Sequence, residues 1–335
     1  MASLKKYFPT LILSVLVYLS YFFFHLPSQH PATKDVLGAA SNVILYEEPD
    51  NGRQPLLDRI DSAKKEILLE IYLLSDKQII SALEDAKSRG VDVKVMLEQH
   101  PFGGDSLNQK TKKQLDAANI ETQWTNASFT LTHEKAIVID AQETCILSQN
   151  LTASSFTKNR EYDVCDTDTA DAEEVRTIFI ADWERKPFSP PAESNLIDSP
   201  DDSRAALTTL MQTTQKTLDI ETEDINDKSI VTILSEKAKT ATVRLIAPTI
   251  SQVSTNENAL RQLASAGVQV KTISSPYMHA KMILSDIRKA YTGSINLSTQ
   301  SLDANRELGI ILTQPDILQT LSTSFETDWN NSSAL

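Results

Sequence analysis

Hydrophobic and polar positions after residue 42 follow two periodicities in turn. Residues 91–97 carry valine or leucine at every second position, which predicts a strand, whereas apolar residues at 56–63 and 79–86 recur at helical spacing. Gly90 follows the second of these helices, where a helix terminator belongs. Further strands are expected at 43–46, 66–74, 121–125, 136–139 and 144–147, and a further helix at 111–118. Strands separated by helices predict an α/β fold in which mixed sheets are flanked by helices.

The same series of elements occurs a second time. Residues 65–71 resemble residues 216–222 at an offset of 151 (216 minus 65), and a helix, a glycine and a strand recur over 259–273. From His133 onward the offset is 146 (279 minus 133), without a gap. The matched positions include Asn159-Arg160-Glu161 with Asn305-Arg306-Glu307, and Phe179-x-x-Asp182-Trp183 with Phe325-x-x-Asp328-Trp329. This register indicates an internal duplication, because chance amphipathic patterning does not reproduce it.

The duplication divides most of the chain into two pseudo-symmetric halves. We expect the halves at 42–186 and 195–335, packed as one bilobal unit. Residues 187–194 contain three prolines and are expected to link them. Each half is expected to form a mixed β-sheet flanked by helices.

The N-terminal segment differs from the rest. Lys5 and Lys6 precede the apolar run Leu11–Phe24, so residues 1–30 are expected to form a hydrophobic helix that is either a signal peptide or a membrane anchor. We favour an uncleaved anchor, because small residues suited to cleavage are missing just after the run. The lysines favour a cytoplasmic N-terminus, which places the remainder outside the cytoplasm; a secreted protein is the alternative. Residues 31–41 are interpreted as a tether.

Composition narrows the range of partners. The chain has 335 residues, 41% of them hydrophobic, and a formal net charge of −13, which suits a globular protein with an acidic surface. Such a surface repels nucleic acid at long range, although a local basic groove can outweigh the average. The two cysteines, Cys145 and Cys165, are either buried thiols or one disulfide, and a disulfide requires an oxidising compartment.

One group of polar residues occurs once in each half at the same spacing. The first copy contains His133, Lys135, Asp140, Ser148 and Asn150, and the second contains His279, Lys281, Asp286, Ser294 and Asn296. If the H-x-K and S-x-N segments are strands, alternate residues share a face, so each half presents four polar groups together. Glu161 and Glu307 follow at matching positions, and Leu147 stands where the second copy has Gly293.

This duplicated H-x-K-x4-D-x6-G-S-x-N pattern resembles the phospholipase D superfamily over residues 42–335. The resemblance implies that one histidine attacks phosphorus to form a phosphohistidine and that the other protonates the leaving oxygen. The first-copy histidine is often the nucleophile in this family, which implies His133 as nucleophile and His279 as acid. The resemblance implies no cofactor and no metal, because Lys135 and Lys281 supply the positive charge.

The remaining motif residues receive roles from the same resemblance. Glu161 and Glu307 are implied as partners of the histidine rings. Asp140 and Asp286 are expected to be structural, because their odd spacing from the motif histidine and lysine places them away from the phosphate. The residues implied to hold the phosphate oxygens are Lys135, Asn150, Ser148, Lys281, Asn296 and Ser294. Leu147 is expected to change the shape of the first half, because glycine allows the closer approach of a ligand.

Several functions use this chemistry. We expect a phospholipase D-like phosphodiesterase that acts on a phospholipid membrane, because an anchor places the site beside lipid and the acidic charge disfavours a long polyanion. The alternatives are a secreted or anchored endonuclease with nucleic acid as substrate, and a phosphatidyltransferase of the cardiolipin synthase type. A non-catalytic binding module is disfavoured by the intact motif pairs. One chain contains both halves, so a monomeric catalytic unit is expected.

Overall fold

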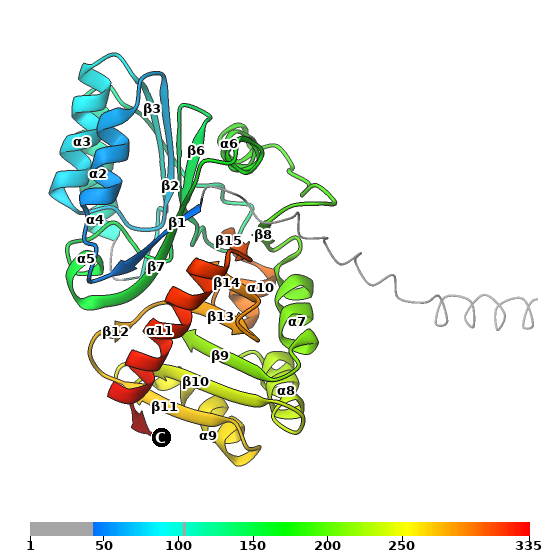
Figure 1. Cartoon of the computed structure of the whole chain (residues 1–335). Coiled ribbons are helices and arrows are strands. Elements are labelled where there is room, and N and C mark those ends of the chain that lie inside the picture. Colours follow the sequence, from blue (N-terminus) through cyan, green and yellow to red (C-terminus); the bar gives the residue numbers. More distant parts are fainter. Residues whose placement is uncertain (1–42, 103–104) are drawn as a thin grey trace, which may run out of the picture. The chain divides into compact units, whose positions relative to one another are not determined.

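The computed structural model describes residues 43–102 and 105–335, coloured by sequence in Figure 1. The expected N-terminal helix (1–30) and tether (31–41) lie outside the described residues. Within the described ranges, every helix is too short or too polar to cross a bilayer.

The first half contains seven strands and five helices in the part of the chain that the structure describes. Its strands are β1 (Val43–Glu48), β2 (Glu66–Ile71), β3 (Asp92–Leu97), β4 (Glu121–Trp124), β5 (Lys135–Ile139), β6 (Glu143–Ile146) and β7 (Asn159–Asp166). Its helices are α2 (Gln54–Ser62), α3 (Lys77–Ser88), α4 (Asp105–Ala117), α5 (Ser155–Lys158) and α6 (Thr169–Glu184). Residues 187–194 connect α6 to the second half.

The second half repeats this series with small additions. Its strands are β8 (Leu196–Ser199), β9 (Thr217–Thr222), β10 (Thr242–Pro248), β11 (Gln269–Ile273), β12 (Tyr277–Met278), β13 (Lys281–Ser285), β14 (Lys289–Gly293), β15 (Glu307–Leu312) and β16 (Ser333–Ala334). Its helices are α7 (Ser203–Thr213), α8 (Lys228–Lys237), α9 (Glu257–Ser265), α10 (Thr299–Asp303) and α11 (Pro315–Asn331), with a 3-10 turn, η2 (Ser254–Asn256).

The two halves have the same sheet topology. The first sheet has the order β1-β7-β6-β5-β2-β3-β4, and the second has β8-β15-β14-β13-β9-β10-β11 followed by β16. In each sheet the three strands β2-β3-β4 or β9-β10-β11 run parallel, and the others in this order pair antiparallel. In addition, β12 of the second half pairs parallel with β7 of the first. The predicted mixed sheets and their duplication are therefore confirmed.

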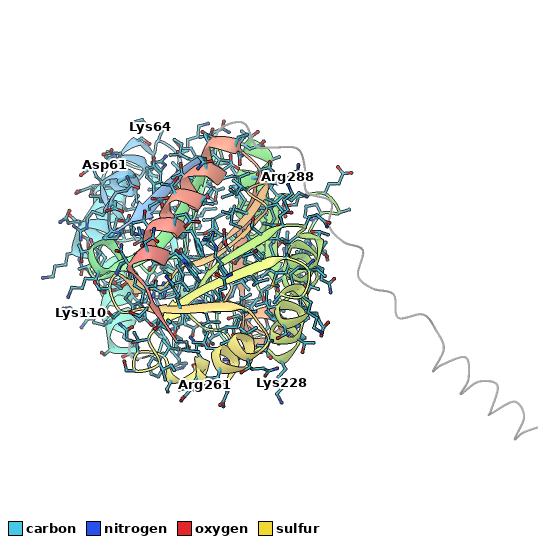
Figure 2. All side chains as sticks on the ribbon, turned by 60° about the horizontal axis from the view of Figure 1, so that its bottom comes forward. Asp61, Lys64, Lys110, Lys228, Arg261 and Arg288 are labelled. Carbon is cyan, nitrogen blue, oxygen red and sulfur yellow. A yellow bond between two sulfur atoms is a disulfide. The ribbon has the colours of Figure 1, made fainter. Side chains whose placement is uncertain are left out.

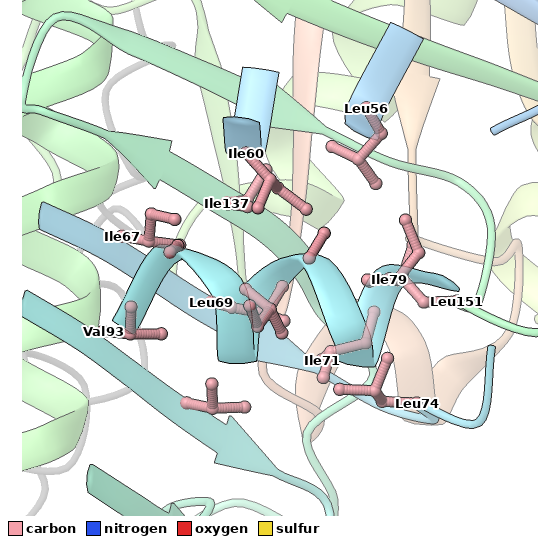
Figure 3. Close-up of a cluster of buried hydrophobic side chains, with 14 of the residues drawn as sticks. Leu56, Ile60, Ile67, Leu69, Ile71, Leu74, Ile79, Val93, Ile137 and Leu151 are labelled. Atoms are coloured by element: carbon pink, nitrogen blue, oxygen red, sulfur yellow. The ribbon is translucent and has the colours of Figure 1, made fainter. Parts of the chain in front are cut away.

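Hydrophobic side chains form three clusters. One lies between α2, α3, α4 and a face of the first sheet, where leucines and isoleucines of the helices meet those of β2 and β5 (Figure 3). A matching cluster lies under α7, α8 and α9 in the second half. The third contains the remaining faces of both sheets with the apolar sides of α6 and α11, so it belongs to both halves. Trp183 and Trp329 pack against this shared cluster, each stacked on a phenylalanine.

Helix ends follow local sequence signals that recur in both halves. Asp76 caps α3 by accepting hydrogen bonds from two backbone N–H groups, and Asp227 caps α8 in the same way. Gly90 ends α3 with a positive φ of 93°. In the second half Gly267 precedes β11. The equivalent residue of the first half is Asn119, which precedes β4 and also has a positive φ, of 60°. Asparagine tolerates this left-handed conformation, so the repeat survives without the glycine.

Candidate active site

Each histidine of the H-x-K segments lies beside a strand of the opposite half. Thr132 forms a parallel bridge with Arg306, and the N–H of His133 donates to the Arg306 carbonyl at 2.8 Å. The second half repeats this arrangement. Met278 of β12 pairs with Arg160 of β7, and the N–H of His279 donates to the Arg160 carbonyl at 3.3 Å. Backbone pairing therefore holds each histidine against a strand of the other half.

The crossing places each histidine against a glutamate of the other half. Nδ1 of His133 lies 3.0 Å from Oε2 of Glu307. Nδ1 of His279 lies 2.8 Å from Oε1 and 2.9 Å from Oε2 of Glu161. A carboxylate on Nδ1 fixes the ring orientation and leaves Nε2 as the atom for chemistry. The site is thus composite, because neither half contains a complete histidine–glutamate pair.

The two glutamates carry charge although they are fully buried. Burial raises the pKa of Glu161, but the His279 charge and its hydrogen bond outweigh burial and lower it overall. The same balance, with His133 as partner, lowers the pKa of Glu307. Burial and the nearby Lys135 charge lower the pKa of the His133 ring itself, which favours a neutral imidazole near pH 7.

The lysines lie directly beside these rings. Nζ of Lys281 donates to the His279 carbonyl at 2.6 Å and to Oε2 of Glu223 at 3.0 Å. Nζ of Lys135 donates to the His133 carbonyl and lies 5.1 Å from the centre of the Tyr72 ring. Burial, followed by repulsion from Lys281, lowers the pKa of Lys135 to about 7. Mutual repulsion between the lysines means that they share one site, which an anion would stabilise.

The S-x-N residues occupy turns that follow β6 and β14, beyond the strands expected to contain them. Ser148 is fully buried, and its hydroxyl donates to Oε2 of Glu161 at 2.7 Å. The Ser294 hydroxyl is also fully buried; it donates to the Leu308 carbonyl at 3.3 Å and accepts from the Leu308 N–H at 3.1 Å. The structure therefore gives these hydroxyls supporting contacts to β7 and β15, and the phosphate contacts expected from the sequence stay a prediction.

The asparagines differ from each other. Oδ1 of Asn296 accepts a hydrogen bond from the Asp224 N–H at 3.2 Å, which anchors the turn after β9. Oδ1 of Asn150 is buried and has no hydrogen-bond partner among the described residues. A buried, unpartnered amide oxygen is costly, so a ligand or water that donates a proton to Asn150 would stabilise this position.

Asp140 and Asp286 stand away from the histidines and hold the backbone. Asp140 accepts hydrogen bonds from the N–H groups of residues 64–66, and Asp286 accepts from those of residues 215–217. Both carboxylates therefore fix the entry of the central strand, β2 or β9, which lies beside the H-x-K strand. Each aspartate has a φ of 54°, at the turn after β5 or β13.

Gly293 is required by strand packing. A Cβ at this position would lie 2.4 Å from Cα of Gly309 and 2.5 Å from the carbonyl oxygen of Leu308. The first half has Leu147 and Asp163 at these two positions, and the Asp163 carboxylate accepts from the Ser148 N–H at 3.0 Å. The two halves therefore differ at two neighbouring positions together, with Leu147 and Asp163 in the first half and Gly293 and Gly309 in the second. Strand packing explains the glycine, and we correct the expectation that it serves the approach of a ligand.

Several residues of the site escaped the sequence reasoning. Arg160 forms a buried, two-contact ion pair with Asp328 of α11, at 2.6 and 3.1 Å. Arg306 pairs likewise with Asp182 of α6, at 2.7 and 3.3 Å. Each arginine precedes the glutamate that meets a histidine, and each pair crosses between the halves. The offset of 146 residues relates both pairs, so the repeat marked these four residues but did not indicate that they pair with one another.

The cysteines form a disulfide. Cys145 of β6 lies directly opposite Cys165 of β7, and the two are bonded. Among the described residues, the one cluster with metal-ligand geometry consists of Glu143 and these cysteines. The disulfide removes both thiolates, so this cluster has no ligand set for a metal.

Comparisons with known proteins find relatives of this chain. The family model described as "Cardiolipin synthase, PLD-like domain" matches residues 56–183 and 207–329. A phospholipase D from Rickettsia bellii is 32% identical over 140 residues, which are 41% of this chain and 65% of that relative. The match thus spans slightly less than two thirds of the relative's length.

Two solved structures share the fold. A phosphatidylserine synthase from Haemophilus influenzae superposes with a TM-score of 0.64 at 14% identity, covering 88% of each chain. A polyphosphate kinase from Porphyromonas gingivalis gives a TM-score of 0.69 at 15% identity, covering 86% of this chain and 47% of that one. At these identities the likeness establishes the two-half architecture alone.

Proposed function

The chain belongs to the phospholipase D superfamily, and from this premise we propose that it hydrolyses a phospholipid phosphodiester through a phosphohistidine. The observation that carries the proposal is the crossed pairing of His133 with Glu307 and of His279 with Glu161. Each pair leaves Nε2 free of that carboxylate, and a buried lysine donates to the carbonyl of each histidine, which suits a nucleophile and an acid acting on one phosphate.

The proposed first step is an in-line displacement. The lone pair on Nε2 of His133 attacks phosphorus, and the bond between phosphorus and the leaving oxygen breaks. That oxygen takes the proton from Nε2 of His279. In the second step water attacks phosphorus and gives a proton to His279, and the P–N electron pair returns to His133. Lys135 and Lys281 stabilise the negative oxygens throughout.

Three features support a lipid substrate outside the cytoplasm. The Cys145–Cys165 disulfide is of a kind that persists in oxidising compartments. The apolar N-terminal segment suits a membrane anchor, and the net charge of −13 disfavours a long polyanion. We therefore propose an extracytoplasmic enzyme, anchored or secreted, that acts as a monomer because one chain holds both pairs.

A phosphatidyltransferase is the second candidate, because the description of the matching family model names cardiolipin synthase. The two activities share the first step and differ in whether water or an alcohol takes the phosphatidyl group. An endonuclease of the same superfamily is the third candidate.

A side-by-side assay separates the candidates. Purified protein is incubated with phosphatidylcholine or phosphatidylethanolamine vesicles, with and without glycerol, and with single- and double-stranded DNA. We expect release of the head group, no DNA nicking, and loss of about 10³-fold or more in His133→Ala and His279→Ala. EDTA should leave the rate unchanged, because two lysines provide the charge. DNA nicking alone would reject the lipid substrate, and inhibition by EDTA that metal reverses would reject the metal-free mechanism.

A further inference from the structure

One position in the site breaks the symmetry of the duplication. The offset of 151 residues that relates β2 to β9 makes Tyr72 of the first half equivalent in position to Glu223 of the second. The backbone is held alike in both halves: the Asn108 side chain donates to the Tyr72 carbonyl, and the Asn256 side chain donates to the Glu223 carbonyl, each at 2.8 Å. Two equivalent backbone positions therefore present side chains of opposite character to two equivalent histidines.

Glu223 contacts three groups of the second half-site. Its Oε2 lies 3.0 Å from Nζ of Lys281 and 3.4 Å from Nε2 of His279. Its Oε1 accepts a hydrogen bond from the Tyr277 hydroxyl at 3.0 Å. The His279 ring is thus placed between two carboxylates, since Glu161 occupies the opposite nitrogen. Burial raises the pKa of Glu223, but the charges on His279 and Lys281 lower it strongly overall.

The first half-site has a neutral group at the corresponding position. The Tyr72 ring meets the His133 ring edge-on, with centroids 4.7 Å apart, and the Tyr72 hydroxyl accepts from the Phe102 N–H at 2.6 Å. The charged groups acting on His133 are Glu307 on Nδ1, Lys135 beside it, and Lys281 and Glu223 at longer range. At His133 an aromatic ring and two cations disfavour an imidazolium. At His279 two carboxylates in contact with the ring favour one, against the charge of Lys281, whose Nζ lies 3.2 Å from Nδ1 and 3.4 Å from Nε2.

We propose that Glu223 is a positioning residue that assigns the roles of the two histidines, holding His279 protonated as the general acid and leaving His133 as the nucleophile. The inference rests on the proposed phosphohistidine chemistry and adds to it a cause for the asymmetry. The mechanism needs one neutral and one protonated ring in the same site, and two identical half-sites provide no preference for either. The Tyr72–Glu223 difference supplies that preference before substrate binds.

The test compares leaving groups. An alkyl alkoxide leaves only with a proton, whereas p-nitrophenolate is a weak base and leaves without one. In Glu223→Gln, kcat/KM for the alkyl diester cleaved by wild type should fall roughly 10–100-fold above neutral pH, within the range of general acid catalysis. Its alkaline limb should move to lower pH, because the variant removes a carboxylate that lies 3.4 Å from Nε2 of the general acid. Cleavage of bis(p-nitrophenyl) phosphate should change little.

Asp224→Asn is the matched control. It removes one negative charge at the adjacent residue, whose carboxylate contacts Asn226 and Thr255 instead of a histidine. We expect wild-type rates and an unshifted alkaline limb for this variant. In wild-type protein denatured in alkali during turnover, where a phosphohistidine survives, peptide mapping should place the phosphoryl group on His133.

Three outcomes would overturn the inference. A phosphoryl group on His279 reverses the roles. An equal loss of kcat/KM for both substrates in Glu223→Gln would mean that Glu223 acts by balancing the charge of Lys281. A lower KM for both substrates with an unshifted limb makes Glu223 a competitor of the phosphate. Failure of wild type to cleave either diester rejects the proposed function instead, so the two failures are distinguishable.

Discussion

The two lysines of the site show how far identical motif residues can differ. Lys281 has a carboxylate partner in Glu223, at 3.0 Å, whereas Lys135 lies over the Tyr72 ring. Burial and the Lys281 charge lower the pKa of Lys135 to about 7. Lys135 is therefore a cation in the free protein only up to about neutral pH, and a bound anion would raise its pKa again.

This pKa predicts the pH dependence of anion binding. Inhibition by tungstate, which remains a dianion across the range, should weaken as the pH rises from 6.5 to 8.5, because Lys135 loses its proton in the free protein. In Lys135→Gln, inhibition should be weaker at pH 6.5 and should depend less on pH. Competitive inhibition constants measured at half-unit steps check both points. Constants for wild type that do not change over this range would contradict the assignment.

Residue identities were predictable, whereas their pairing was not. The motif singled out both histidines and both glutamates, but nothing in the spacing indicates that a glutamate serves the opposite half. The crossing depends on the bridge between Thr132 and Arg306 and its counterpart between Met278 and Arg160. These contacts span more than 100 residues of sequence, and periodicity reports only local structure.

At the scale of elements, the predicted alternation of helices and strands is confirmed, and the placement of the motifs on them is corrected. The strands β5 and β13 begin at Lys135 and Lys281, so each histidine precedes its strand. The alternation rule placed His and Lys on one strand face because it assumed a longer strand. The histidine backbone instead bonds to the opposite half, which a pattern within one segment does not reveal.

Strand packing at Gly293 yields a prediction at this scale. Gly293→Ala forces β14 and β15 apart, because its Cβ would lie 2.4 Å from Gly309, and Glu307 lies on the displaced strand. Overpacking together with a positive φ should lower the free energy of unfolding by about 3 kcal/mol, and activity should fall with it.

Gly267→Ala is the matched control for this effect. Gly267 also has a positive φ, of 95°, but a Cβ there would meet nothing within 4 Å. Its loss of stability should therefore be confined to backbone strain, roughly 1 kcal/mol, with activity unchanged. Urea unfolding of both variants checks the difference. Equal losses would show that the β14–β15 contact is not what demands glycine.

At the scale of the whole molecule, ionisable groups divide into two populations. Asp61, Lys64, Lys110, Lys228, Arg261 and Arg288 project from the surface, as Figure 2 shows, and such groups contribute little to stability. The second population is buried where the two halves meet. It includes the pairs of Arg160 with Asp328 and Arg306 with Asp182, and the carboxyls of Glu70, Glu134 and Glu221.

The repeat predicted two halves, but little in the sequence indicated these buried ionisable groups. Glu70 and Glu221 occupy matching positions in the apolar strands β2 and β9, where alternation alone suggests a solvent-facing side chain. Both strands lie at the centre of a sheet that is covered on both faces. The faces of β2 and β9 that carry Glu70 and Glu221 are therefore buried against the other half. A pattern within one half cannot indicate this burial.

The burial of these ionisable groups can be tested at Glu221. Burial, then repulsion from Asp328, raises its pKa to about 8, against the opposing effects of Tyr162 and Arg160. Between the ordinary glutamate pKa of about 4.3 and this value, the folded state binds a proton that the unfolded state lacks. The free energy of unfolding should therefore fall as pH rises through this window, and the Glu221 contribution should be lost above pH 8.

Glu221→Gln removes the titration and keeps the shape of the side chain, so its stability relative to wild type should increase between pH 5 and pH 9. A gain of about 1 kcal/mol or more by pH 9 is expected, since one pKa unit corresponds to about 1.4 kcal/mol. Glu236→Gln, at an exposed position paired with Lys239, should give a constant difference. Urea unfolding across this range decides the matter. A Glu221→Gln difference that also stays constant would mean that Glu221 is already ionised at pH 5, and the meeting of the two halves would then have to accommodate a buried negative charge.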